Sequence, residues 1–166
     1  TPPAEWNGAD TVTVLVSDLD NGGDHAGEGL TATSSVAVTV TAVNDAPVIA
    51  VDRSGAWPRA VEEGTSLTFD GRLTLADSDF DELNGHRAKM TVSLNVSAGT
   101  LALVDPAAAP LVAWSVGSST APSSSLVFGA PLTDVNMLLA GLSYTPPNGW
   151  FGEVMLTIAP HDQGNS

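Results

Sequence analysis

Closely spaced carboxylates in the middle of the chain could bind a metal ion. Asp77 and Asp79 stand two positions apart, and Asp81 and Glu82 follow directly. Calcium takes about six to eight oxygen ligands, mostly carboxylates, with carbonyl groups and waters completing the shell. In a loop, several of these side chains can converge on one ion. The run is not an EF-hand loop, because Glu82 stands where that loop requires glycine. The alternative is a solvated acidic loop that binds no ion.

A second acidic segment, Asp18-Leu19-Asp20-Asn21-Gly22-Gly23-Asp24, is rich in glycine. Asp18 and Asp20 are therefore further calcium candidates. Aspartate and glycine are also ordinary residues of hairpin turns, and the turn is the stronger interpretation of this segment.

Two segments could carry sugar. Asn95-Val96-Ser97 is an N-glycosylation sequon, so Asn95 is a candidate site even though it falls near the end of an expected strand. Residues 118–125 consist mainly of Ser, Thr and Pro, and we expect a mobile loop there that could take O-linked sugar.

Catalysis finds little support in the residue pattern. His25, His86 and His161 all fall in predicted turns. The sequence has no nucleophile elbow, no zinc-protease helix motif and no phosphate-binding loop. We therefore do not expect an enzyme.

The composition and charge of the chain limit the kinds of molecule that it is expected to bind. The formal net charge is −14, with only five Lys and Arg residues. Nucleic acids and anionic membranes attract basic surfaces, so neither is an expected partner. No apolar run approaches the roughly 20 residues of a membrane span. The chain has no cysteine, so in an extracellular setting bound metal is the obvious means of stiffening the fold.

Alternation of apolar and polar residues predicts many short strands, separated by turn residues such as Asp70-Gly71 and Asn148-Gly149. This spacing is typical of an all-β sandwich or barrel. One segment, 133–140, has helical spacing, and Thr133 is expected to cap a short helix that stops at Gly141. The expected strands are 11–16, 36–43, 48–51, 66–69, 73–75, 89–96, 100–104, 111–116, 126–128, 142–145 and 153–159.

The chain contains an internal repeat. Thr1-Pro2-Pro3-Ala4-Glu5-Trp6-Asn7-Gly8 returns 144 positions later as Thr145-Pro146-Pro147-Asn148-Gly149-Trp150-Phe151-Gly152, and eight of the 22 overlapping positions are identical. Such spacing is typical of tandem domains. We expect residues 1–43 to be the closing strands of one repeat, 44–47 a linker that ends at a proline, and 48–166 a second repeat without its final strand.

The four tryptophans could stack on sugar rings. Trp6 and Trp150, however, hold equivalent positions in the repeat, beside proline and glycine. Packing at the end of a sandwich is the stronger interpretation for them.

An ordered set of motifs resembles a known family. Val43-Asn44-Asp45-Ala46-Pro47 is similar to the linker of bacterial cadherin-like repeats in large surface adhesins, and residues 75–85 resemble the Asp-x-Asp…Asn-Gly stretch of those repeats. Residues 92–101, 139–146 and 162–165 match in the family's order. The resemblance implies an Ig-like, cadherin-like Greek-key β-sandwich, an extracellular or cell-surface location, and calcium at the joints between repeats.

By this resemblance, Asn44 and Asp45 of the linker would share calcium ions with Asp77 and Asp79. Glu63, or the adjacent Glu62, matches the acidic residue of the family's first strand and would serve a following joint.

These expectations favour a structural and adhesive repeat of a large extracellular surface or filament protein. Its partners would be neighbouring repeats of the same chain or like copies, and its ligands cell-surface glycans or proteins. Two alternatives stay open. One is a glycan-binding β-sandwich module, and the other is a subunit of a head-to-tail fibre in which residues 1–43 of one copy complete the next by strand addition.

Overall fold

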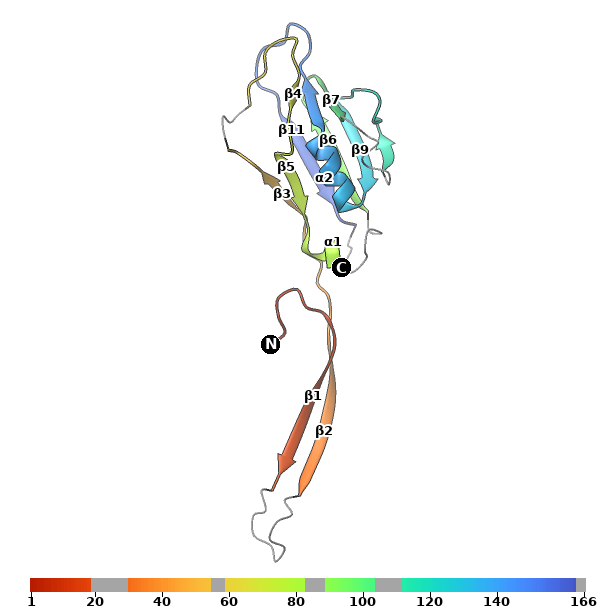
Figure 1. The fold of residues 1–166 in the computed structure, drawn as a ribbon. Helices are drawn as coiled ribbons and strands as arrows, with labels where there is room; N and C mark the ends of the chain where they lie inside the picture. Colours follow the sequence, from red (N-terminus) through yellow and green to blue (C-terminus); the bar gives the residue numbers. More distant parts are fainter. Residues whose placement is uncertain (19–29, 55–58, 83–88, 104–111, 164–166) are drawn as a thin grey trace, which may run out of the picture. The chain divides into compact units, whose positions relative to one another are not determined.

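A computed structural model describes residues 1–18, 30–54, 59–82, 89–103 and 112–163 (Figure 1). The chain divides into two compact units, Thr1–Val43 and Asn44–Ser166.

Antiparallel strands dominate both units, and the described residues contain two helices. The strands are β1 (Gly8–Ser17), β2 (Thr31–Val40), β3 (Val48–Val51), β4 (Leu67–Thr68), β5 (Leu73–Ala76), β6 (Met90–Val96), β7 (Thr100–Leu103), β8 (Ala113–Val116), β9 (Ser125–Ala130), β10 (Leu142–Thr145) and β11 (Leu156–His161); the helices are α1 (Ser78–Glu82) and α2 (Leu132–Ala140). The predicted all-β class is confirmed, with two helices where one was expected. No helix among the described residues has the length and apolarity to cross a membrane.

The first unit is a two-stranded ribbon made of β1 and β2. Their ladder runs from Gly8 opposite Val40 to Ser17 opposite Thr31. Directly opposed residues share a face, so one face collects valines and the other mostly threonine, serine and alanine. The valine-rich face is exposed in this unit; Val12, Val14, Val16, Val36 and Val38 each keep 40–60% of their surface in solvent. A two-stranded ribbon with an uncovered apolar face is only marginally stable in water.

The observed ribbon corrects the strand ends expected from sequence. Alternation continues to Val43, yet β2 ends at Val40, because its partner strand begins at Gly8. At the other end, pairing with β1 draws residues 31–35 into the ladder, although their Thr-rich sequence shows no clear apolar alternation. The extent of the partner strand β1 thus sets where β2 begins and where it ends.

The described residues of the second unit form three antiparallel sheets (Figure 1). Their strand orders are β11-β6-β9-β8, β4-β10-β7 and β3-β5. Asp70 and Gly71 both have positive φ, and they form the tight turn that leads into β5. An Asp-Gly pair suits this turn because both residues tolerate positive φ.

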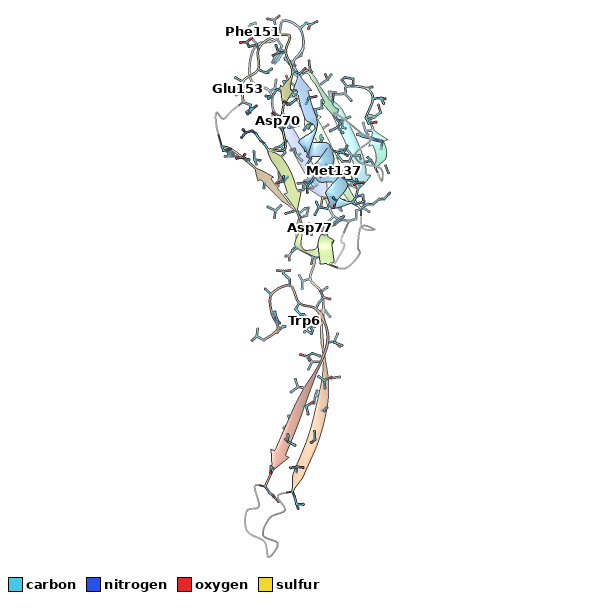
Figure 2. All side chains as sticks on the ribbon, viewed as in Figure 1. Trp6, Asp70, Asp77, Met137, Phe151 and Glu153 are labelled. Atoms are coloured by element: carbon cyan, nitrogen blue, oxygen red, sulfur yellow. The ribbon has the colours of Figure 1, made fainter. Side chains whose placement is uncertain are left out.

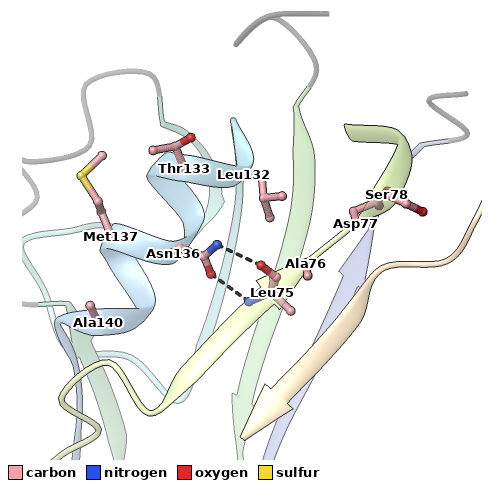
Figure 3. A pocket seen from close by; sticks show the side chains of 9 residues that line it. All are labelled: Leu75, Ala76, Asp77, Ser78, Leu132, Thr133, Asn136, Met137 and Ala140. Carbon is pink, nitrogen blue, oxygen red and sulfur yellow. Dashed lines mark hydrogen bonds between the residues drawn. The ribbon is translucent and has the colours of Figure 1, made fainter. Parts of the chain in front are cut away.

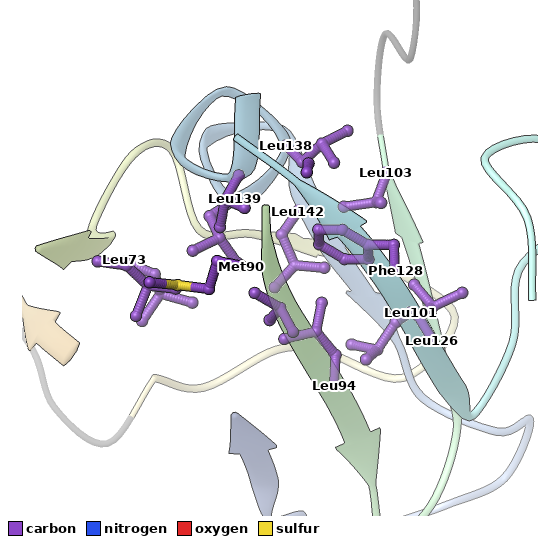
Figure 4. Packing of buried hydrophobic residues seen from close by; sticks show 14 of the residues in the cluster. Leu73, Met90, Leu94, Leu101, Leu103, Leu126, Phe128, Leu138, Leu139 and Leu142 are labelled. Atoms are coloured by element: carbon purple, nitrogen blue, oxygen red, sulfur yellow. The ribbon is translucent and has the colours of Figure 1, made fainter. Parts of the chain in front are cut away.

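Side chains from the two larger sheets, β5 and α2 meet in one hydrophobic core (Figure 4). Strict alternation along β6 and β9 places every second residue in this core. The fully buried residues are Met90, Val92, Leu94, Leu101, Leu126, Phe128, Ala130, Val135 and Leu142, with Leu138 and Leu139 at 1% exposure.

Helix α2 confirms the helical segment predicted near 133–140, although its start differs in detail. The helix begins at Leu132, Pro131 is the N-cap residue, and no side chain caps it. Thr133 therefore lies inside the first helical turn. Pro131, with φ −56° and ψ 149°, is the last extended residue, so the helix starts one residue before Thr133. Gly141 ends the helix as expected.

Helix α1 replaces the acidic loop that the sequence suggested. Asp77 accepts a hydrogen bond from the backbone N–H of Asp79 at 3.1 Å. This is the bond that an N-cap aspartate makes, and it starts a single helical turn directly after β5. The helix is too short for an apolar period to reveal it in the sequence.

Candidate metal centre

Acidic and amide side chains gather at the end of the second unit where β3 begins and β5 ends. The β3–β5 register places Val48 opposite Ala76. In an antiparallel pair, the residues before one strand lie beside those after the other. This register therefore brings Asp45 to Asp79, and a carboxylate oxygen of each lies within 4.8 Å of the other.

Hydrogen bonds hold the segment before β3 against this end. The Asp45 backbone N–H donates to Asp79 Oδ2 at 2.5 Å, and the Ser78 hydroxyl donates to Asp45 Oδ2 at 3.3 Å. The Asn44 side-chain amide donates to Asp162 Oδ2 at 2.6 Å. Asp162 follows β11, so the contacts join three separate stretches of the chain. We call Asn44, Asp45, Asp77, Asp79 and Asp162 the acidic cluster.

Asp77 is the most unusual member of the acidic cluster. Its side chain is 7% exposed, and although Oδ1 caps α1, Oδ2 has no hydrogen-bond partner among the described residues. Burial raises the pKa of Asp77, and the nearby negative charges of Asp162 and Asp79 raise it further, against the lowering effect of the bond from the Asp79 N–H. A buried, unpaired carboxylate oxygen costs free energy unless a cation or a proton satisfies it.

The donor set fits calcium. The acidic cluster offers four carboxylates and one amide oxygen, without thiol or imidazole, and hard oxygen donors are what calcium prefers. In the described part of the chain, no Lys or Arg forms a salt bridge with Asp45, Asp77 or Asp79. Within the described residues of the second unit alone, no three carboxylates bring oxygens within 4.8 Å of one another. A bound ion would therefore also need water or carbonyl oxygens.

The sequence anticipated four members of the acidic cluster and missed the fifth. Asn44, Asp45, Asp77 and Asp79 lie at this one end of the second unit, and their sharing of calcium stays a prediction. Asp162 belongs to the motif at residues 162–165, but the sequence did not indicate it as a metal ligand. Its identity with Asp18 across the repeat was the available signal, because a residue kept at both copies of a strand end invites a shared role.

Other predicted ligands lie elsewhere. Glu63 accepts a hydrogen bond from the Gly149 N–H at 3.0 Å, so it braces the repeated Pro-Pro turn. Asp18 accepts one from the Leu30 N–H at 2.8 Å, at the end of the β1–β2 ladder, and residues 19–24 of that acidic segment lie outside the described residues. Asp81 belongs to α1, but its side chain lies outside the described residues, as does the whole of Asp20.

The candidate glycosylation site lies on a well-formed strand. Asn95 is exposed on β6, between Ser125 of β9 and Thr157 of β11. Its modification stays a prediction. Residues 118–125 include Ser123, which bonds to Leu101 through two backbone hydrogen bonds of 2.8 and 3.0 Å.

A surface hollow lies between α2 and β5, beside Asp77 (Figure 3). Asn136 spans it: its amide oxygen accepts from the Leu75 N–H at 2.8 Å, and its amide nitrogen donates to the Leu75 carbonyl at 2.9 Å. Both polar ends of Asn136 are therefore used in fixing α2 to β5. The remaining lining is mainly apolar and contains no titratable group besides Asp77.

The aromatic residues fall into two groups. Trp114 packs against Phe128 with ring centroids 5.2 Å apart, which is ordinary core packing. Trp150 is 43% exposed and Phe151 is 93% exposed, so the repeated turn carries apolar surface into solvent (Figure 2). Trp57 lies outside the described residues.

Comparison with protein-family models, with curated proteins and with solved structures gives no match.

Proposed function

We propose that the chain is a structural and adhesive repeat of a large extracellular protein, built as an Ig-like Greek-key sandwich of the cadherin-like kind. Calcium binding at the acidic cluster would stiffen the joint between repeats. The observation that carries the calcium part is the Asp77 Oδ2 atom, which is buried without a hydrogen-bond partner among the described residues, in a carboxylate that also feels the negative charges of Asp162 and Asp79.

The position of the acidic cluster explains why a cation there would matter mechanically. Asn44 and Asp45 are the first residues of the second unit and follow Val43 directly. Their hydrogen bonds to Asp162 and Asp79 fasten this segment to the unit's body. Four carboxylates repel one another, so a divalent cation that neutralises them would strengthen the attachment. The chain would then leave the unit at a fixed angle.

The oxygen donor set supplies the chemistry for such an ion, and calcium there would be held by Asp45, Asp77, Asp79 and Asp162. Extracellular calcium modules commonly bind with dissociation constants of about 0.1–1 mM. Binding in that range suits an extracellular setting, in which calcium is abundant.

Small-angle scattering on the full chain tests the proposal. We expect a narrower distribution of interatomic distances in about 5 mM calcium than in EDTA, because a fixed joint restricts the two units. Magnesium at the same concentration serves as the control, since it demands stricter octahedral geometry than calcium. Identical distributions in calcium and EDTA would remove calcium from the proposal.

A glycan-binding role is the second candidate, and the exposed ring of Phe151 favours it. Aromatic faces in solvent can stack on sugars. A glycan array with the parent chain and Phe151→Ala tests this role. Binding by the parent that Phe151→Ala loses would support a glycan site at this turn, and no binding by either form would leave the structural role.

A further inference from the structure

We infer that the free edge of β11 is a docking site for one more strand, an extended segment with the sequence pattern of β2. Among the described residues, β11 pairs only with β6, so its other edge is open. The inference rests on the internal repeat. Because β1 and β11 hold equivalent positions in the repeat, the strand that pairs with β1 indicates the kind of strand that would pair with β11. It is independent of calcium.

The repeat is conserved in backbone conformation as well as in sequence. Glu5 has φ 63° and its counterpart Gly149 has φ 70°. Gly8 has φ 131° and its counterpart Gly152 has φ 137°. Glycine adopts positive φ readily, but a glutamate rarely does, so Glu5 at the angle of Gly149 and the near-equal angles of Gly8 and Gly152 indicate the same turn in both copies.

The hydrogen bonds of the two turns match as well. The Trp6 N–H donates to the Pro3 carbonyl at 3.4 Å, and the Trp150 N–H donates to the Pro147 carbonyl at 3.2 Å. The strand that leaves the first turn is β1 and the strand that leaves the second is β11, so these two strands are structural counterparts.

The faces of the two strands correspond. In β11, Leu156 and Ile158 pack against the hydrophobic core of the second unit. Their counterparts in β1 are Val12 and Val14, which lie on the valine-rich face of the ribbon. That face is therefore built like the core-facing side of a sheet, and β2 continues it with Val36 opposite Val12.

The edges correspond too. Met155 directs its carbonyl to Ser97 on the β6 side, so alternation turns the backbone groups of residues 156, 158 and 160 outward. In the ribbon, the Asp18 N–H donates to the Leu30 carbonyl, so residues 12, 14 and 16 direct their backbone groups to β2. The open edge of β11 is thus the edge that β1 uses to bind β2.

Applying the ribbon's register to β11 fixes the expected complex. The incoming strand runs antiparallel to β11, with the residue equivalent to Val36 opposite Leu156 and the one equivalent to Val38 opposite Val154. Their side chains then extend the core face. Pro160 is the one departure, because it has no N–H for the ladder. It stands near the end of the strand, where a lost hydrogen bond disturbs the pairing least.

A chain extended in repeat register tests the inference. Ser166 stands at the repeat position of Gly22, so residues 23–43 can be appended directly after it. We expect the melting temperature of the second unit to rise by at least about 5 °C, since added burial and pairing stabilise the native state. Hydrogen exchange should slow along residues 152–161.

The matched control is the same extension with its copies of Val36, Val38 and Val40 replaced by threonine, which keeps strand propensity and shape but not the apolar face. Its rise in melting temperature should be less than half that of the valine form. An unchanged melting temperature in the valine extension, an equal rise in the threonine form, or protection that falls on β1 and not on β11 overturns the inference.

Discussion

The substitution Asp77→Asn separates the cost of the acidic cluster from its capacity to bind calcium. Asparagine keeps an oxygen that can cap α1 through the Asp79 N–H, and it removes one of four crowded charges. Leaving a buried acceptor unpaired costs about 1–3 kcal/mol. We therefore expect Asp77→Asn in EDTA at neutral pH to raise the free energy of unfolding by about 1–2 kcal/mol, or the melting temperature by several degrees.

The contribution of Asp77 to stability should decrease as the pH rises. Because the folded state raises the pKa of Asp77, that state binds the proton more tightly than the unfolded chain does. The penalty is absent at pH values below the ordinary aspartate pKa, and it grows as pH rises through the raised one. The parent in EDTA should lose stability over that interval, and Asp77→Asn should lose less.

In calcium the parent chain should be more stable than Asp77→Asn, which is the reverse of their order in EDTA. A ligand at 100 times its dissociation constant stabilises the native state by about 2.7 kcal/mol, and Asp77→Asn should forgo most of that gain. Denaturant unfolding followed by tryptophan fluorescence, in EDTA and in calcium, measures both effects. Asp70→Asn is the matched control: it removes one charge from an exposed turn whose positive φ asparagine tolerates. If Asp77→Asn destabilises the chain in EDTA, or responds to calcium as the parent does, the reasoning about Oδ2 is wrong.

Two further substitutions test the fold. Gly99→Ala would place a Cβ 2.8 Å from the Tyr144 ring at φ 83°, so we expect the free energy of unfolding to fall by at least about 3 kcal/mol in thermal melts. Gly64→Ala, at φ 74° with open space around it, should lower it by only about 1 kcal/mol in the same assay. Equal losses would mean that the backbone angle, not the contact, matters at Gly99. Asn136→Ala should lower the free energy of unfolding by about 1–3 kcal/mol in denaturant, because it leaves an N–H and a carbonyl of β5 without their hydrogen bonds. The control Thr133→Ala changes an exposed residue of the same helix and should be near neutral. A neutral Asn136→Ala would show that water replaces both bonds.

Sequence reasoning was most reliable where one local pattern decides the structure. Alternation located β6, and helical spacing followed by Gly141 located α2. It was less reliable where a partner strand decides, as at the ends of β1 and β2. Helix α1 escaped prediction because a single turn has no period; a capping bond from Asp77 defines it.

The acidic cluster shows the same division. Asp77 and Asp79 are visible in sequence because they are neighbours, and the motif at residues 43–47 added Asn44 and Asp45. Asp162 lies more than 80 positions from Asp79 in the chain and joins them only because β11 ends near β3 and β5. Spacing in sequence cannot report a contact that strand order creates.

The contrast between the ribbon and the core has a consequence for proteolysis. The valines of β1 and β2 are exposed on a ladder that no other described strand extends, while β6 is paired on both edges and its inner side chains are fully buried. A broad-specificity protease should therefore cleave residues 8–40 long before it cleaves β6. The digest would pass through a resistant product that begins near Asn44, and its lifetime would report how firmly the second unit holds together without the ribbon.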